Sequence, residues 1–143
     1  MDSNIPEIDM TRLKENELEV ACVKLFSNLG WDAKLASDVS FGTRTLRPDI
    51  VLSDGLKDCG YVEVISSMKP ESIWRKKEQI QFIIDKCKPA IFILTNGIVF
   101  DVFYDGKYSG SNSTPPSIHT FKTLYRGREY SNALKEHLNK KGD

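Results

Sequence analysis

Two short apolar runs, each containing one carboxylate, constrain the fold more than any other feature of the sequence. Residues 47–52 read Arg-Pro-Asp-Ile-Val-Leu, residues 61–65 read Tyr-Val-Glu-Val-Ile, and the connector between them contains Asp-Gly. Runs rich in Val, Ile and Leu on either side of turn residues predict an antiparallel β-hairpin. The two carboxylates, Asp49 and Glu63, need an explanation, because acidic side chains are rarely buried without a partner.

The register of this hairpin decides how the two carboxylates are related. If Ser53 pairs with Cys59 across a five-residue connector, Asp49 pairs directly with Glu63 further along the ladder. Directly opposite residues point to the same face, with Cβ atoms about 4.5–5.5 Å apart. Carboxylates that close repel unless a cation lies between them or one is protonated. We therefore expect Asp49 and Glu63 to face each other within metal-bridging distance.

Composition indicates one globular domain without a general attraction for nucleic acid. The chain has 143 residues, 40% of them hydrophobic, and its 20 basic and 20 acidic residues cancel. Any nucleic-acid binding must then use a local patch. The three cysteines form no CxxC pair, the two histidines form no zinc motif, and the first residues do not read as a signal peptide. These features predict a cytoplasmic protein with reduced thiols, and no apolar run is long enough to cross a membrane.

The chain divides into a loose lead-in, residues 1–10, and a single domain, residues 11–143. Apolar residues recur at helical spacing up to Gly30, and a second helix begins at Pro70 and ends at Lys88-Pro89. The other predicted elements are strands at residues 31–41, 47–52, 59–65, 90–94 and 98–104, a surface loop at 109–116, a strand at 118–125 and a helix at 129–140. The core is expected within residues 11–104, and the last strand and helix within residues 117–141.

Two glutamates of the first predicted helix border its apolar stripe. At 100° per residue, Glu15 lies about 60° from Leu18 and Glu19 lies about 100° from it. Either side chain could lean toward the sheet as a further ligand. Either could equally be an ordinary solvated residue at the edge of the helix.

The order of helix, three strands, helix and two strands predicts an α/β sandwich around a mixed sheet. With Pro-Asp in the second strand and a glutamate in the third, the chain resembles the PD-(D/E)xK nuclease superfamily, and most closely the nuclease-like N-terminal domain of type I restriction enzyme motor subunits. The motifs that carry this resemblance are Glu15 ahead of Leu29-Gly30-Trp31, the run at 47–52, Val62-Glu63-Val64-Ile65, Gln79-Ile80 and Leu94-Thr95-Asn96-Gly97. The resemblance implies a restriction-endonuclease-like αβββαβ core with a mixed central sheet flanked by helices.

The resemblance also implies a metal and a substrate. In that superfamily the acidic residues bind Mg²⁺ or Mn²⁺, which polarises the scissile phosphate and lowers the pKa of the attacking water. The implied metal ligands are Asp49, Glu63 and one of Glu15 or Glu19, and Gln79 joins the catalytic set. The implied substrate is nucleic acid, with DNA expected.

One position departs from the family. Ile65 stands where the family has its catalytic lysine, which orients the water and stabilises developing charge. Lys69 is one replacement, although a continued strand puts it roughly 13 Å beyond position 65 unless the chain turn before the second helix shortens the path. Lys76 and Lys77 are the others, because they could reach over the sheet from that helix.

Structural interpretations of the same residues stay open. A buried, unpaired carboxylate costs several kcal/mol, so Glu63 could instead pair with Arg44 or Arg47. The Arg75-Lys76-Lys77 run could be a solvated helix face. In the functional interpretation, these five basic residues bind nucleic acid.

Two functional classes follow. The first is a metal-dependent endonuclease domain of a restriction or defence system, acting with or without other subunits of a larger assembly. The alternative is a catalytically inactive module of the same fold that binds nucleic acid or a protein partner, which Ile65 and the zero net charge favour. Metal binding coupled to DNA cleavage separates the two classes.

Overall fold

The structure is a computed structural model that describes residues 15–36, 39–41, 44–46 and 48–124, with the backbone alone described for Glu15, β2 and β3. Its elements are α1 (Glu15–Asn28), β1 (Asp32–Leu35), β2 (Val39–Phe41), β3 (Arg44–Leu46), β4 (Ile50–Ser53), β5 (Asp58–Val64), α2 (Pro70–Phe82), a π-helical turn η2 (Ile83–Cys87), β6 (Ile91–Thr95), β7 (Phe100–Tyr104) and β8 (Lys107–Asn112). Residues 118–124 form a further helical segment.

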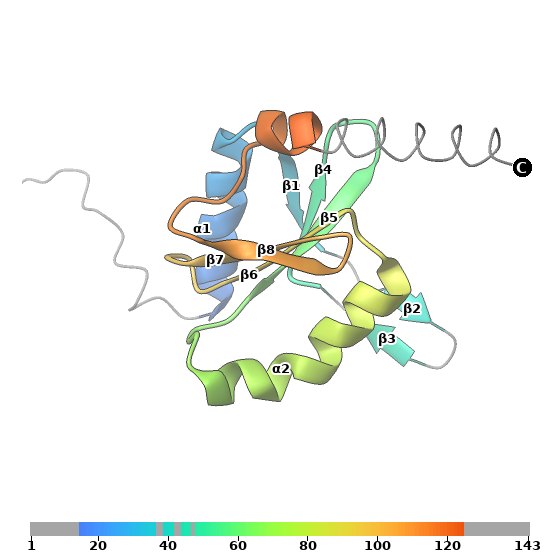
Figure 1. The fold of residues 1–143 in the computed structure, drawn as a ribbon, viewed down its shortest axis with the longest axis vertical. Helices are drawn as coiled ribbons and strands as arrows, with labels where there is room; N and C mark the ends of the chain where they lie inside the picture. Colours follow the sequence, from blue (N-terminus) through green and yellow to red (C-terminus); the bar gives the residue numbers. More distant parts are fainter. Residues whose placement is uncertain (1–14, 37–38, 42–43, 47, 125–143) are drawn as a thin grey trace, which may run out of the picture.

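Six strands form one mixed sheet in the order β1-β4-β5-β6-β7-β8 (Figure 1). All neighbours are antiparallel except β5 and β6, which are parallel. Parallel neighbours need a long crossover, and α2 provides it. The predicted α/β class and the αβββαβ core order, here α1, β1, β4, β5, α2 and β6, are confirmed. No described helix is long and apolar enough to span a membrane.

The predicted strand over residues 31–41 is wrong in one respect, because it is two strands. β1 ends at Leu35, and the chain then forms β2 and β3, a separate two-stranded ribbon outside the αβββαβ order (Figure 1). Polar and turn residues surround these short strands, so their apolar alternation is too brief to reveal the break.

The C-terminal part of the sequence prediction needs three corrections. β7 begins at Phe100 instead of at residue 98, and β8 occupies part of the predicted loop at 109–116. Residues 118–124 are helical where a strand was predicted, and Ser117 caps them by accepting the N–H of Thr120. The predicted helix at 129–140 lies outside the described residues.

The core is divided between the two faces of the sheet. The larger cluster lies beneath α1 and has 16 buried residues, among them Leu18, Cys22 and Phe26 of that helix. The smaller cluster faces α2 and has four, namely Ile65, Ile83, Phe92 and Leu94. No residue of α2 itself is fully buried. The second face therefore has room for polar side chains between the helix and the sheet.

Candidate functional site

The β4–β5 hairpin has the predicted register at the end where the carboxylates lie. Ile50 pairs with Val62, and Leu52 pairs with Gly60. The predicted Ser53–Cys59 pair is wrong, since Ser53 pairs with Asp58 after a bulge. The bulge lies at the turn and leaves the ladder toward Asp49 and Glu63 in the predicted alignment.

Asp49 lies where the chain enters β4, and it links strands on both sides. Its main-chain carbonyl accepts the N–H of Ala36 at 3.1 Å, and its carboxylate Oδ2 accepts the N–H of Val64 at 2.7 Å. The carboxylate therefore takes the place of a backbone acceptor at the end of β5. This hydrogen bond holds the Asp49 side chain beside Glu63, the residue that precedes Val64.

Glu63 lies in the middle of the sheet with 0% of its surface exposed. Gln79 of α2 donates a hydrogen bond from Nε2 to Glu63 Oε1 at 3.3 Å, and the Lys76 ammonium lies 3.9 Å from Oε2. Lys76 and Gln79 are three residues apart and so share one side of the helix. From the described residues, Oε2 accepts no hydrogen bond. A buried carboxylate oxygen in this state has capacity for another ligand.

The electrostatics of the pair favour the addition of a cation. Burial and, to a smaller extent, the charge of Asp49 raise the pKa of Glu63, the Lys76 ammonium acts in the opposite direction, and the pKa that results is about 8. At neutral pH without a cation, Glu63 thus keeps its proton for most of the time. A divalent cation would remove the repulsion between the carboxylates and allow both to ionise.

The donor set fits a hard divalent cation such as Mg²⁺. This ion binds proteins through one or two carboxylates, keeps several waters and uses substrate phosphates as further ligands. Within the described residues, no three His, Cys, Asp or Glu side chains form a metal-binding group. Asp49 and Glu63 supply two carboxylates, the number that Mg²⁺ commonly takes from a protein.

Of the two glutamates of α1, the structure describes the side chain of Glu19 but not that of Glu15. Glu19 is partly buried, and its charge and that of Asp49 add to the burial that raises the pKa of the Cys22 thiol to about 11. Glu19 and Asp49 thus approach the same thiol from the helix and the sheet. Glu15 begins α1, and its side chain lies outside the described residues.

The basic residues predicted for the site divide into three groups. Lys69 precedes α2 and is exposed, as are Arg75 and Lys77 on the helix. The Arg44 side chain and the whole of Arg47 lie outside the described residues. In the described part of the chain, the cation recorded beside Glu63 is therefore Lys76. The three-residue spacing puts Lys76 on the same helix side as Gln79, but the sequence does not specify that this side faces Glu63.

Ile65 has a packing role in this fold. It is 3% exposed within the smaller core cluster, and its N–H donates to the Thr95 carbonyl at 2.9 Å. A lysine at this position would have to push its ammonium out of an apolar cluster. The cation beside Glu63 comes from α2 instead.

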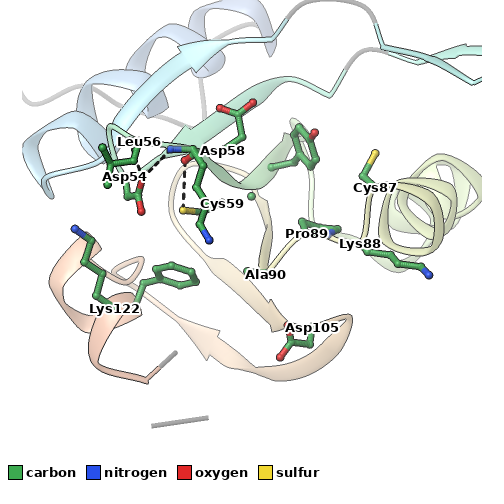
Figure 2. A pocket seen from close by; sticks show the side chains of 14 residues that line it. Asp54, Leu56, Asp58, Cys59, Cys87, Lys88, Pro89, Ala90, Asp105 and Lys122 are labelled. Atoms are coloured by element: carbon green, nitrogen blue, oxygen red, sulfur yellow. Dashed lines mark hydrogen bonds between the residues drawn. The ribbon is translucent and has the colours of Figure 1, made fainter. Parts of the chain in front are cut away.

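A cavity of about 480 Å³ lies near the start of β5, at the end of the strand opposite to Glu63 (Figure 2). Figure 2 shows Asp54, Cys59, Cys87 and Lys122 around it, from four segments of the chain. Asp54 is engaged in its own turn, where it accepts the N–H groups of Leu56 and Lys57. Cys59 and Glu63 are four residues apart in one strand, about 13 Å, so this cavity is separate from the carboxylate pair.

No protein-family model matches the chain, and no curated protein matches it. Among solved structures, a candidate nuclease of the DUF820 family from Anabaena variabilis covers 73% of this chain and 69% of its own, at 13% identity and a TM-score of 0.49. The DrdV–DNA complex covers 66% of this chain at 16% identity and a TM-score of 0.46, and the match spans 9% of that protein's chain. Both TM-scores are too low for either likeness to support a function.

Proposed function

We propose that this chain is a Mg²⁺-dependent nuclease domain in which Asp49 and Glu63 hold the metal. The observation that supports it is the fully buried Glu63, with an Oε2 that accepts no hydrogen bond from the described residues, next to a second carboxylate. Burial of Glu63 next to a second carboxylate is costly to the fold, and such costly, pKa-shifted groups concentrate at functional sites. Mn²⁺ would serve as an alternative ion.

The residues of the chain have distinct parts in this proposal. The metal, when bound, supplies a Lewis acid for the phosphate and lowers the pKa of a bound water. The Val64 N–H fixes the Asp49 carboxylate, and the Gln79 amide holds Glu63 Oε1 so that Oε2 faces its ligand. Lys76 then takes the part of the lysine that is missing at position 65, because its ammonium lies 3.9 Å from Oε2.

The proposed substrate is nucleic acid, DNA in the first instance, within a restriction or defence system that can include other subunits. Exposed Lys69, Arg75 and Lys77 give the helix above the site a local basic surface although the chain has no net charge. Cationic side chains next to a metal site attract phosphates and position the strand.

Cleavage assays with Mg²⁺ or Mn²⁺ test this proposal. Asp49→Ala and Glu63→Ala should each lower the rate on the order of 10³-fold, since a metal contributes several kcal/mol to the transition state. Lys76→Ala should lower it by on the order of 10²-fold, because a lost charge-stabilising donor costs about that much. Glu78→Ala removes an exposed carboxylate of the same helix and is the matched control. Cleavage that persists in chelator or in both carboxylate variants would refute the assignment.

A second candidate is a binding module of the same fold without cleavage, and the burial of Ile65 at the lysine position favours it. Such a module would bind nucleic acid or a protein partner equally well with chelator and with Mg²⁺. Its wild type would not cut DNA at any metal concentration. Metal-independent binding together with absent cleavage would select this candidate.

A further inference from the structure

An apolar groove lies along the flank of α2 opposite to the flank that carries Lys76 and Gln79. It encloses about 520 Å³ and is lined from the helix by Ile73, Trp74, Lys77 and Ile80 and from the sheet by Leu94 and Phe103. Trp74 precedes Lys76 by two residues, so the two side chains leave the helix about 160° apart. The groove and the carboxylate pair therefore occupy opposite flanks of one helix.

Trp74 is the most unusual residue of this groove. Its side chain is 68% exposed, whereas the other tryptophan, Trp31, is 3% exposed and donates its indole N–H to the Pro116 carbonyl. An exposed indole leaves a large apolar surface in water, and such surfaces mark interaction sites. The Lys77 ammonium lies 4.3 Å from the centre of the Trp74 ring. This cation–π contact fixes the ring and covers part of it with positive charge.

The charges around the groove indicate an anionic occupant. Among its described lining residues, Lys77 is the only charged one. Residues 69–78 carry four cations, Lys69, Arg75, Lys76 and Lys77, against two carboxylates, Glu71 and Glu78, so this stretch is basic on balance. A second protein with a purely apolar face would offer no anion to the Lys77 ammonium. A nucleic-acid strand offers both an apolar base face and phosphates.

We propose that this groove binds an unpaired nucleobase, stacked on Trp74, of a single-stranded or locally unpaired nucleic acid. Aromatic side chains stack on bases of any sequence, and neighbouring cations hold the phosphates. Bases inside a duplex are stacked on one another and do not reach such a ring. The groove thus selects strands with at least one free base.

This inference rests on the proposed function and specifies its substrate. The helix that presents Trp74 and Lys77 on one flank presents Lys76 and Gln79 to Glu63 on the other. The diameter of a helix with its side chains is about 10 Å, so a strand held at Trp74 passes close to the carboxylate pair. The nuclease would then act next to single-stranded or unpaired positions.

Tryptophan fluorescence in the presence of chelator tests the groove independently of cleavage. Titration with a single-stranded oligothymidylate should quench the exposed Trp74, while buried Trp31 supplies a constant background. Trp74→Leu should abolish the quenching and weaken single-strand binding roughly tenfold, the effect of one lost stacking contact. Leu56→Ala, which trims a side chain that is 93% exposed on the β4–β5 turn, is the matched control and should change neither property.

The outcomes separate the groove from the nuclease. Asp49→Ala should retain the quenching, because base stacking needs no metal. Equal single-strand affinities of wild type and Trp74→Leu, or a preference for blunt duplex, would overturn the groove and leave the nuclease proposal standing. Quenching by a wild type that never cuts would support the groove and refute the nuclease proposal. A concentration-dependent dimer that disappears in Trp74→Leu would show that a second copy fills the groove, and would also overturn the inference.

Discussion

The two faces of the sheet are built for different purposes. Beneath α1, 16 buried residues form a continuous apolar cluster, and Phe26 and Phe100 meet edge to face. Beneath α2, only four apolar residues are buried together, a buried glutamate lies on the same face, and the helix that covers them has no fully buried residue of its own. The first face stabilises the fold, and the second gives up part of that stabilisation to keep a carboxylate away from water.

Under the proposed function, stability and function oppose each other on the α2 face only. Substitutions beneath α1 should affect stability alone, as in ordinary cores. Replacement of a polar residue beneath α2 should make the protein more stable and remove its function, the usual result at strained functional sites. Three substitutions test this contrast.

Phe26→Ala should have the largest effect, a loss of about 3–5 kcal/mol in the free energy of unfolding, because it leaves a cavity at a residue that is 0% exposed. Denaturant unfolding with fluorescence detection measures it. Cleavage per folded molecule should stay unchanged below the melting transition. A specific loss of cleavage in the folded variant would show that the α1 face also serves the site.

Ile65→Lys should cost about 3 kcal/mol of stability, since it places a cation in the apolar cluster of Phe92 and Leu94. It should raise cleavage little, because Lys76 already provides an ammonium beside Glu63. Thermal unfolding and cleavage must be measured on the same sample. A folded Ile65→Lys protein that cuts well, from a wild type that does not, would show that Lys76 does not do the work of a lysine at position 65.

Glu63→Gln should stabilise the chelator-treated protein by on the order of 2 kcal/mol at pH 8 and by little at pH 5. The pKa of Glu63 rises from 4.5 to about 8 on folding. Protonated Glu63 therefore favours the folded state. This contribution is complete below pH 4.5 and is lost as the pH rises toward 8, where the buried group must ionise. Melting temperatures of both proteins between pH 5 and 9 should diverge as the pH increases. Parallel curves would mean that Glu63 stays ionised in the folded protein throughout this range.

The part of the site that rests on strand alternation could be predicted from the sequence. Asp49 and Glu63 came together because the paired strands keep a constant register and a face is set by alternation. The bulge at Ser53 could not be predicted, since it depends on the detailed geometry of the turn. It did not matter to the site because it lies at the opposite end of the hairpin.

The missed elements share a lack of apolar periodicity. β8 is an edge strand whose residues are mostly exposed, so its polar sequence resembles a loop. The helical segment at 118–124 buries Phe121 beside Trp31. The segment is so short that its apolar residues fit the spacing of a strand as well as that of a helix. The choice of Lys76 over Lys69 and Lys77 needed the position of α2 on the sheet, which local sequence does not specify.

Calorimetric titration of the protein with Mg²⁺ or Mn²⁺ at pH 7 tests the central claim most directly. The wild type should bind one ion and release a proton on binding, because the pKa of Glu63 is about 8 without metal and a ligand must be ionised. Buffers with different enthalpies of ionisation reveal that proton. Asp49→Asn should bind far more weakly, and Glu63→Gln should release no proton. Equal binding by the wild type and both variants, or no binding by any of them, would contradict the assignment of Asp49 and Glu63 as metal ligands.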